Sequence, residues 1–370
     1  MRNIEDRQVI SDGSFTNWFK DNYSQADKYL YMLGVGFDER MCEGISRFSE
    51  IGIPFDVWEI NYNEGATSPS KEYIEKVKSN KEQLDHILSK SQILHVEQKH
   101  IKLWQEDSGS SVKEDNNVHF VGEVNASKIV KSSITELESY SDIIIDVSAL
   151  PQTIYLCIIN TLFKCSTDSQ RIYIVVNENY TTDMLIEPAQ AEETAHEVQG
   201  YSSPSEELNS VIIWYPILGE VNKAYLEKYL SFLKSHSRDV DEICPVVPFP
   251  SVNIRRADSI ISQYSKTLFD DWGVDKKNII YASETNPILV CNNLIQASES
   301  YRAALSPLGE SKFVFSAITS KLMTIGMLLA AFDLKSEGYN VSILGISNKG
   351  YWINNSKKSN TQNRLICLAV

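Results

Sequence analysis

The residues best suited to chemistry lie in one turn between a short apolar run and a long apolar helix. Ser316, Thr319 and Lys321 follow the run 313–315 and overlap the start of a helix that is apolar over 322–332. Hydroxyls, backbone N–H groups and a lysine at a helix N-terminus favour an anion such as a phosphate. Plain helix capping, with the lysine stem lying along apolar surface, is the alternative.

The turn after residues 28–33 combines small and charged side chains. Gly36, Asp38 and Arg40 lie between this predicted strand and a helix predicted over 41–51. Arg40 suits a bidentate clamp on an anionic group, or it pairs with an exposed acid. Asp38 either caps the helix or joins a ligand site. All three residues are therefore ligand-binding candidates.

The glycines of this turn have the layout of a dinucleotide-binding fingerprint. Gly34 and Gly36 precede a helix, and Glu59 lies near the end of the next predicted strand. In such a fingerprint the glycines admit a pyrophosphate and the acid holds a ribose hydroxyl. Glu39 stands at the third glycine position and would repel a phosphate. A tight turn that needs the backbone freedom of glycine is the simpler interpretation.

Two carboxylates are the catalytic candidates if the chain is an enzyme. Asp146 ends an apolar strand, and Glu284 follows another. Ser148 and Asn286 are predicted to cap the helices that come next, and both are also ligand-binding candidates. Asp146 and Glu284 would then act as base or nucleophile at the edge of a sheet. A structural role for each carboxylate is the alternative.

Several motifs of known chemistry are missing from the sequence. It contains no GxxxxGK[ST], no GxSxG and no HExxH. All six histidines lie in polar segments, and their spacing fits no metal-binding pattern. We therefore predict no metal site and no cofactor.

Composition limits the classes of partner. The 370 residues carry a formal net charge of -14, which disfavours binding along extended nucleic acid. The longest apolar run, 322–332, is shorter than the roughly 20 residues that cross a bilayer. The first residues lack the apolar core of a signal peptide, and none of the six cysteines forms a CxxC pair. We expect a cytoplasmic protein with free thiols and no membrane contact.

The elements that position these residues alternate between strand and helix. This pattern predicts an α/β fold of two Rossmann-like halves, with mainly parallel sheets flanked by helices. We place the halves at 1–207 and 208–370, with a mobile polar loop at 104–118. Three prolines argue against a central strand at 244–254. Residues 364–370 are predicted to add an edge strand.

The two halves share a coarse pattern. Each opens with a strand, a turn carrying glycine and glutamate, and a helix, at 30–48 and 212–233. Each closes with strand, serine-containing turn, apolar helix and strand, at 143–176 and 313–344. Internal duplication is one interpretation, and a chance likeness between two α/β halves is the other.

Two turns resemble those of CARF and SAVED domains, the Rossmann-like nucleotide sensors of bacterial antiviral defence. The matching segments are 316–321 (SAITSK) and, more weakly, 146–151 (DVSALP). SAVED domains are two fused CARF-like halves. The resemblance implies nucleotide sensing by an α/β protein, and the sequence shows no effector motif, so an effector would be a separate chain.

Three functions follow from these observations. The first is a sensor that binds a small nucleotide-like ligand where the polar turns after residues 33, 147, 282 and 315 meet. It would signal to a protein partner or to a second copy. The second is a nucleotide-processing enzyme, a hydrolase or a glycosyl-bond-cleaving enzyme, that uses Asp146 or Glu284. The third is a scaffold subunit whose polar turns are only helix caps.

Overall fold

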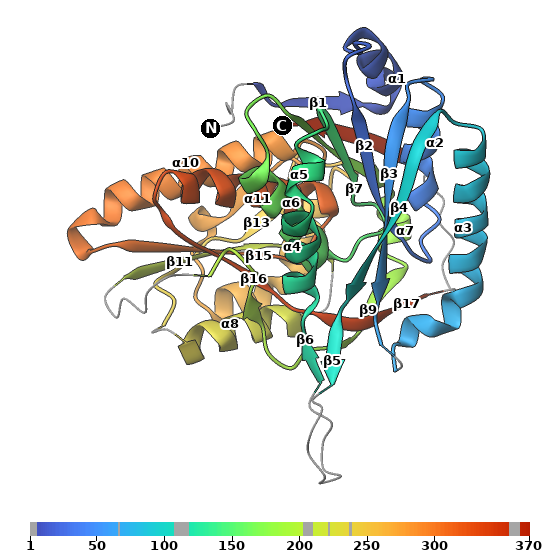
Figure 1. Cartoon of the computed structure of the whole chain (residues 1–370). Helices are drawn as coiled ribbons and strands as arrows, with labels where there is room; N and C mark the ends of the chain where they lie inside the picture. Colours follow the sequence, from blue (N-terminus) through green and yellow to red (C-terminus); the bar gives the residue numbers. More distant parts are fainter. Residues whose placement is uncertain are drawn as a thin grey trace. The chain divides into compact units, whose positions relative to one another are not determined.

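The computed structural model describes residues 6–65, 67–106, 118–202, 210–220, 223–236, 239–354 and 363–370. These residues form two compact units, and each is described by itself (Figure 1). The first unit comprises Met1–Gln190 and Asn348–Val370, and the second comprises Ala191–Ser347. The sequence instead predicts a single boundary after residue 207. The difference arises because the C-terminal segment pairs with the sheet of the first unit.

The first unit is built on a seven-stranded sheet in the order β1-β18-β8-β7-β2-β3-β4. Strands β8, β7, β2, β3 and β4 are parallel, and β18 runs antiparallel to both of its neighbours. Its strands are β1 (Gln8–Ser11), β2 (Tyr29–Val35), β3 (Phe55–Asn63), β4 (Ile93–Lys102), β7 (Asp142–Asp146), β8 (Arg171–Glu178) and β18 (Arg364–Ala369). Every residue of β2 and β7 is buried, as expected for parallel strands covered on both faces.

Helices cover both faces of this sheet. Figure 1 shows α2 and α3 on one side and α4, α5 and α6 on the other. The helices are α1 (Asp12–Asp21), α2 (Met41–Ser49), α3 (Ile74–Ser89), α4 (Gly122–Ser132), α5 (Ile134–Leu137), α6 (Gln152–Cys165) and α7 (Tyr180–Asp183), with a 3-10 turn at Pro69–Tyr73. The unit also has two small two-stranded sheets: β5 (Trp104–Glu106) antiparallel to β6 (Val118–Phe120), and β9 (Ile186–Ala191) beside β17 (Asn348–Ile353). The rest of the predicted mobile loop, 107–117, lies outside the described residues.

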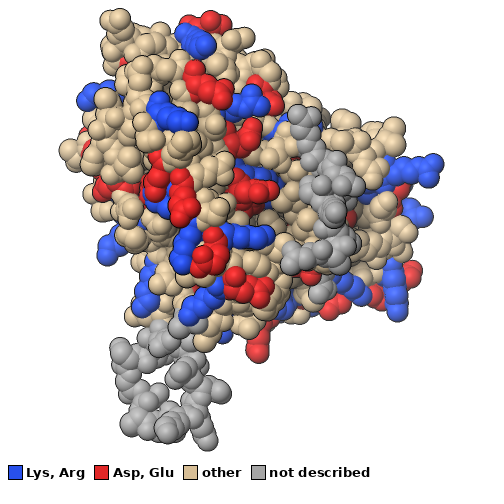
Figure 2. All heavy atoms as spheres, turned by 90° about the vertical axis from the view of Figure 1, so that its right-hand side faces the viewer, with Lys and Arg blue, Asp and Glu red and all other residues tan. Residues whose placement is uncertain are grey.

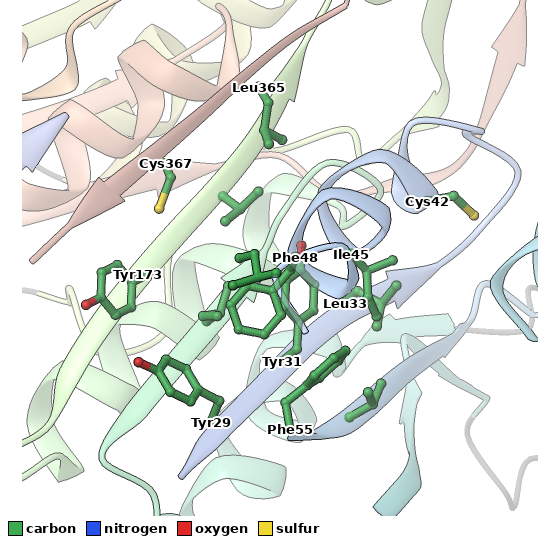
Figure 3. Packing of buried hydrophobic residues seen from close by; sticks show 14 of the residues in the cluster. Tyr29, Tyr31, Leu33, Cys42, Ile45, Phe48, Phe55, Tyr173, Leu365 and Cys367 are labelled. Carbon is green, nitrogen blue, oxygen red and sulfur yellow. The ribbon is translucent and has the colours of Figure 1, made fainter. Parts of the chain in front are cut away.

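Aromatic rings fix α2 against the sheet. Phe48 of α2 lies 5.0 Å from Phe55 of β3 and 5.6 Å from Tyr31 of β2, measured between ring centroids. Figure 3 shows these rings gathered beneath α2, with Tyr29 and Tyr173 beside them. Such contacts add specific geometry to the burial of large apolar areas. They hold the C-terminal end of α2 against β2 and β3.

The second unit has a sheet in the order β10-β16-β15-β11-β13-β14, with β12 beside β11. All strands are parallel except β10, which runs antiparallel to β16. The strands are β10 (His196–Glu197), β11 (Val211–Ile217), β12 (Glu242–Ile243), β13 (Val246–Pro248), β14 (Ile280–Ala282), β15 (Ser311–Ala317) and β16 (Asn340–Gly345). The helices are α8 (Ala224–His236), α9 (Arg256–Ser265), α10 (Pro287–Leu305) and α11 (Lys321–Ser336), with a π-helical turn at Lys266–Asp271 and 3-10 turns at Lys276–Asn278 and Ser306–Leu308.

Two strand predictions are wrong. Strand β13 lies inside its sheet, between β11 and β14, although the prolines at 244–254 argue for an edge. It escapes the restriction because it is only three residues long and its proline, Pro248, is its last residue. Strand β18 is also internal, since β1 pairs with its outer side. The sequence does not predict β1 or β4, because polar and charged residues interrupt the apolar residues of both strands.

Both units use one strand order. Numbered along the chain, the parallel strands of each sheet run 3-2-1-4-5: β4-β3-β2-β7-β8 in the first and β14-β13-β11-β15-β16 in the second. An antiparallel strand flanks the fifth strand in both units. The chain is therefore an α/β protein of two Rossmann-like halves, as predicted. In each, the order reverses between the first and fourth strands, where such sheets bind ligands.

The surface mixes charges of both signs. On the face toward which α3 lies, Figure 2 shows lysine and arginine side chains interspersed with aspartate and glutamate. Pairs along α3 such as Lys78–Glu75 are examples of this pattern. Within the part of the chain that the structure describes, each helix is too short or too polar to cross a membrane.

Candidate functional site

In the first unit, the predicted glycine turn lies at the strand-order reversal but is closely packed. A Cβ atom on Gly34 would lie 2.6 Å from Cδ2 of Leu150, and one on Gly36 would lie 2.4 Å from the hydroxyl of Tyr62. Neither glycine has positive φ. These positions therefore require glycine for close approach, and the predicted need for backbone freedom is wrong.

The first unit's own side chains pack against the glycines and the acid of the predicted fingerprint. The Tyr62 hydroxyl donates to the Ala149 carbonyl at 3.0 Å. The Asn80 side chain donates to the Gly36 carbonyl at 2.9 Å. Glu59, the candidate for a ribose hydroxyl, is buried and pairs with Lys81 at 3.0 Å. A dinucleotide could enter only after these groups moved.

Arg40 is clamped between two acids at this edge. Its Nε and Nη2 atoms donate to Asp38 at 2.9 and 2.6 Å, and its Nη1 lies 2.7 Å from Asp183. Burial opposes the charge of Arg40, but Asp183 and Asp38 outweigh it and raise the arginine pKa. The Asp38 side chain accepts from the Arg40 N–H, and no side chain caps α2. Of the two interpretations of Arg40, the structure agrees with pairing to an acid. The arginine itself is buried, and Asp183 is the partly exposed partner.

Asp146 and Ser148 serve the interior of the first unit. Oδ2 of Asp146 accepts from the Tyr31 hydroxyl at 3.0 Å, and Oδ1 accepts from the Ser148 N–H at 2.9 Å. The Ser148 hydroxyl accepts from the Asn177 N–H at 2.8 Å. Helix α6 has Pro151 at its N-cap, so the predicted cap by Ser148 is wrong. Both Asp146 and Ser148 are buried, with their polar atoms committed to these bonds.

Glu64 and Ser68 form a polar group in the first unit that the sequence does not predict. It lies after β3, where Glu64 accepts from the Ser68 hydroxyl at 2.6 Å. Burial raises the pKa of Glu64, and hydrogen bonds from Ser68 and Ser70 offset part of that rise. Burial, followed by the charge of Glu64, also raises the pKa of Tyr351 to about 12. The sequence feature that marks this group is an acid, Glu64, directly after the strand β3.

In the second unit, Arg256 joins two strand ends. Its Nε and Nη2 atoms each donate to Glu220 at 2.8 Å, and Nη1 donates to Glu284. Glu220 follows β11, and Glu284 follows β14. Arg256 and Glu284 are both buried. Glu284 therefore has a structural role, the alternative that the sequence left open for it.

Glu284 also ties down the segment after β13. Its Oε2 accepts from the Val252 N–H at 2.7 Å, and its own N–H donates to the Pro250 carbonyl at 3.0 Å. This segment, 249–254, presents Val252 and Ile254 to solvent, with 72% and 77% of their surfaces exposed. The Arg256–Glu284 pair therefore anchors an exposed apolar segment.

The turn between β15 and α11 lies at the strand-order reversal of the second unit. A Cβ atom on Gly219 would lie 2.5 Å from the Ile318 carbonyl oxygen. Ser316 is buried and accepts from the Trp214 indole N–H at 3.0 Å, which removes it from the surface. The Ser320 hydroxyl accepts from the Met323 N–H at 3.5 Å and caps α11.

The remaining candidates of the second unit lie at its rim. Thr319 and Lys321 are partly exposed, with Lys321 the first residue of α11. Asn286 accepts from the Ile288 and Leu289 N–H groups, which confirms its predicted cap on α10.

The predicted residues thus fall into two groups at the carboxyl edges of two sheets. The first unit holds Gly36, Asp38, Arg40, Asp146 and Ser148, and the second holds Glu284, Asn286, Ser316, Thr319 and Lys321. Among the described residues, no cluster of three or more histidine, cysteine, aspartate or glutamate side chains is arranged to hold a metal. The geometry offers internal ion pairs in each unit and, in the second unit, a partly exposed lysine at a helix start.

Comparison with known proteins identifies no family. No protein-family model matches the sequence, and no curated protein matches it. An S-adenosylmethionine-dependent methyltransferase from Clostridium acetobutylicum aligns at 7% identity with a TM-score of 0.20, over 50% of this chain and 58% of that chain. Coclaurine N-methyltransferase bound to N-methylheliamine and SAH aligns at 8% identity with a TM-score of 0.18, over 96% and 71%. The chain thus spans less than two thirds of the first of these structures. The strand order, rather than these similarities, defines the fold.

Proposed function

We propose that the protein is a sensor of a small nucleotide-like anion, which binds at the carboxyl edge of the second unit's sheet. The observation that supports this placement is the position of Thr319 and Lys321. They lie beside the strand-order reversal between β11 and β15, at the N-terminus of a 16-residue helix. The positive end of the helix dipole and the lysine ammonium both favour a phosphate there.

The two edges differ in how accessible they are. In the first unit, Tyr62 and Leu150 fill the reversal point, and Asp146 and Ser148 are buried. In the second unit, Thr319 and Lys321 are partly exposed, and the Thr319 hydroxyl lies 3.5 Å from the Met323 sulfur. A ligand at that rim needs no buried side chain to move, so we place binding on the second unit.

A chain of contacts would carry the signal. The turn that holds Thr319 packs against Gly219, and the next residue, Glu220, holds Arg256. Arg256 holds Glu284, which anchors the segment 249–254 through Val252. A ligand that shifts the turn would therefore alter this exposed apolar segment.

We further propose that the partner is a separate effector and that the setting is bacterial antiviral defence. The support is the resemblance of 316–321 and 146–151 to the turns of CARF and SAVED sensors, together with the lack of an effector motif. The exposed Val252 and Ile254 offer an apolar contact surface.

Catalysis receives less support than binding. Both oxygens of Glu284 are engaged, by Arg256 and by the Val252 N–H, and both oxygens of Asp146 accept internal hydrogen bonds. A general base needs a free oxygen within reach of the proton that it removes. The carboxylates are better suited to holding the sheet edge together.

The proposal is tested by measuring the melting temperature with NAD, ADP-ribose, ATP, and linear and cyclic oligonucleotides. We expect a rise of several degrees with one class, because a ligand that binds only the folded state stabilises it. Lys321→Glu should abolish that rise. Lys277→Glu is the matched control, since this exposed lysine precedes β14 at the opposite end of the sheet.

Three outcomes would contradict the proposal. Equal affinity in the Lys321→Glu variant would exclude this placement. No shift with any ligand class would favour the scaffold function instead. Loss of ligand over time, abolished by Glu284→Gln, would point to the enzyme.

A further inference from the structure

The longest strand of the first unit lies at the edge of its sheet. Strand β4 has ten residues and would extend about 33 Å. Within the described residues its only neighbouring strand is β3. Exposed edge strands present a row of backbone groups that can pair with another chain, so proteins usually keep them short or cover them.

The side chains of β4 are unusually exposed for a strand. Leu94 has 71% of its surface exposed, and Val96 has 38%. Val124, on the helix α4 that packs against β4, is exposed as well. Exposed apolar side chains such as Leu94 and Val96 on a long strand at a sheet edge are typical of a surface that another chain covers.

On its outer side β4 has no strand partner among the described residues, so alternate residues there offer backbone hydrogen-bonding groups. Leu103, just after the strand, donates inward to the Asn63 carbonyl. Because successive residues of a strand direct their backbone groups to opposite sides, Lys102, His100, Gln98 and Val96 direct theirs outward. The Lys102 carbonyl accepts from the Asn125 side chain, which agrees with this assignment and marks the end of the open stretch.

The charges of β4 are self-complementary around Gln98. If two copies pair antiparallel with Gln98 opposite Gln98, then Glu97 of each copy faces Lys99 of the other. Gln98 directs its backbone groups outward, so this register forms hydrogen-bonded pairs at Gln98 and at Val96 with His100. Glu97 and Lys99 already lie 2.6 Å apart within one chain. Pairing would join two such ion pairs into a four-charge network.

We propose that the chain forms a symmetric dimer in which the β4 strands of two copies pair antiparallel about Gln98. This would join the two first-unit sheets into one continuous sheet. A two-fold interface of this kind is self-complementary, as the charge pattern requires. It is independent of the ligand proposed for the second unit.

The test is a charge exchange measured by analytical ultracentrifugation. Wild type should be a dimer, and Glu97→Lys and Lys99→Glu should each weaken self-association by about tenfold or more, because each places like charges opposite each other twice. The double variant E97K/K99E restores opposite charges and should dimerise like wild type. An equimolar mixture of the two single variants should form a heterodimer, seen by native mass spectrometry.

The outcomes separate the proposal from its alternatives. Lys99 lies 4.0 Å from the ring centroid of Trp58, so Lys99→Glu could disturb folding. Glu97→Lys leaves that contact in place, and its behaviour decides the case if the other variant does not fold. A monomeric wild type, or single variants that dimerise as tightly as wild type, would overturn the proposal.

Discussion

Each unit holds an arginine between two carboxylates at the carboxyl edge of its sheet, but the two arrangements differ in the exposure of their acids. In the first unit, Asp38 is only two residues from Arg40, and Asp183 has 33% of its side-chain surface exposed. In the second unit, Arg256 reaches partners 36 and 28 residues away that follow two different strands. The first joins the turn after β2 to α7 through a partly exposed acid, whereas the second joins three segments through acids that are only 15% and 3% exposed.

The glycines at the two reversal points differ in the kind of group that they approach. Gly36 approaches the end of a tyrosine side chain, whereas Gly219 approaches a backbone carbonyl. A side chain can rotate away, but a carbonyl between a strand and a helix can move only if both elements move. Units that share a strand order can thus differ in how rigidly they hold the same edge.

The largest difference is expected from removing each arginine. Arg256→Ala leaves Glu220 and Glu284 without their cation in a buried setting, and it should cost about 3–5 kcal/mol of unfolding free energy. Arg40→Ala should cost less, since water reaches Asp183. Urea unfolding gives the free energies, and hydrogen exchange assigns each change to a unit. A larger loss of unfolding free energy for Arg40→Ala than for Arg256→Ala would contradict this prediction.

An intermediate effect is expected at the glycines. Gly219→Ala should cost about 1–3 kcal/mol or more, because the added methyl meets the Ile318 carbonyl. Gly36→Ala should cost less, and Tyr62→Phe should rescue it by removing the hydroxyl that lies 2.4 Å from the new atom. Thermal unfolding of the single and double variants measures both. If Tyr62→Phe fails to rescue Gly36→Ala, the backbone is as rigid in the first unit as in the second.

The smallest effect is expected at Glu64, which has serine hydroxyls as partners where Glu284 has an arginine. Its folded-state pKa is raised by burial, so the folded protein retains a proton that the unfolded chain releases. Stability therefore falls as the pH rises from the ordinary value of 4.5 to the raised value. Glu64→Gln should raise the melting temperature at neutral pH, and this gain should shrink toward pH 4.

The control for this prediction is an acid on the same unit's surface. Glu75→Gln on α3 removes a carboxylate that is mostly exposed, so it should not reproduce the pH-dependent gain. A pH-independent effect at Glu64 would show that the hydrogen bond to Ser68, and not the charge, sets its contribution.

The fold was accessible from the sequence because buried parallel strands leave a strong signal. The runs at β2, β7, β11 and β15 are apolar on both faces, and a helix separates each run from the next strand. Strand β4 lacked that signal, since charged and polar residues fill 97–100 and its apolar Leu94 and Val96 are exposed. Strand β13 was obscured by its prolines.

The candidate residues were found more readily than their partners. Polar turns after apolar strands are visible in sequence, and their positions at the sheet edges are as expected. The pairing of Arg256 with Glu220 and Glu284 joins residues far apart in the chain, which no local pattern reports. The filling of the first edge by Tyr62 depends on side-chain packing, and local periodicity does not encode it.

The return of the chain to its first sheet has a consequence for synthesis. Ala191–Ser347 is inserted between segments of the first unit, and the ends of this insert meet where the Glu192 N–H donates to the Ser347 carbonyl. A ribosome therefore completes the inserted unit while β8 still lacks β18. The unit begun first is finished last, and a nascent chain stopped before residue 364 leaves its sheet open beside β8.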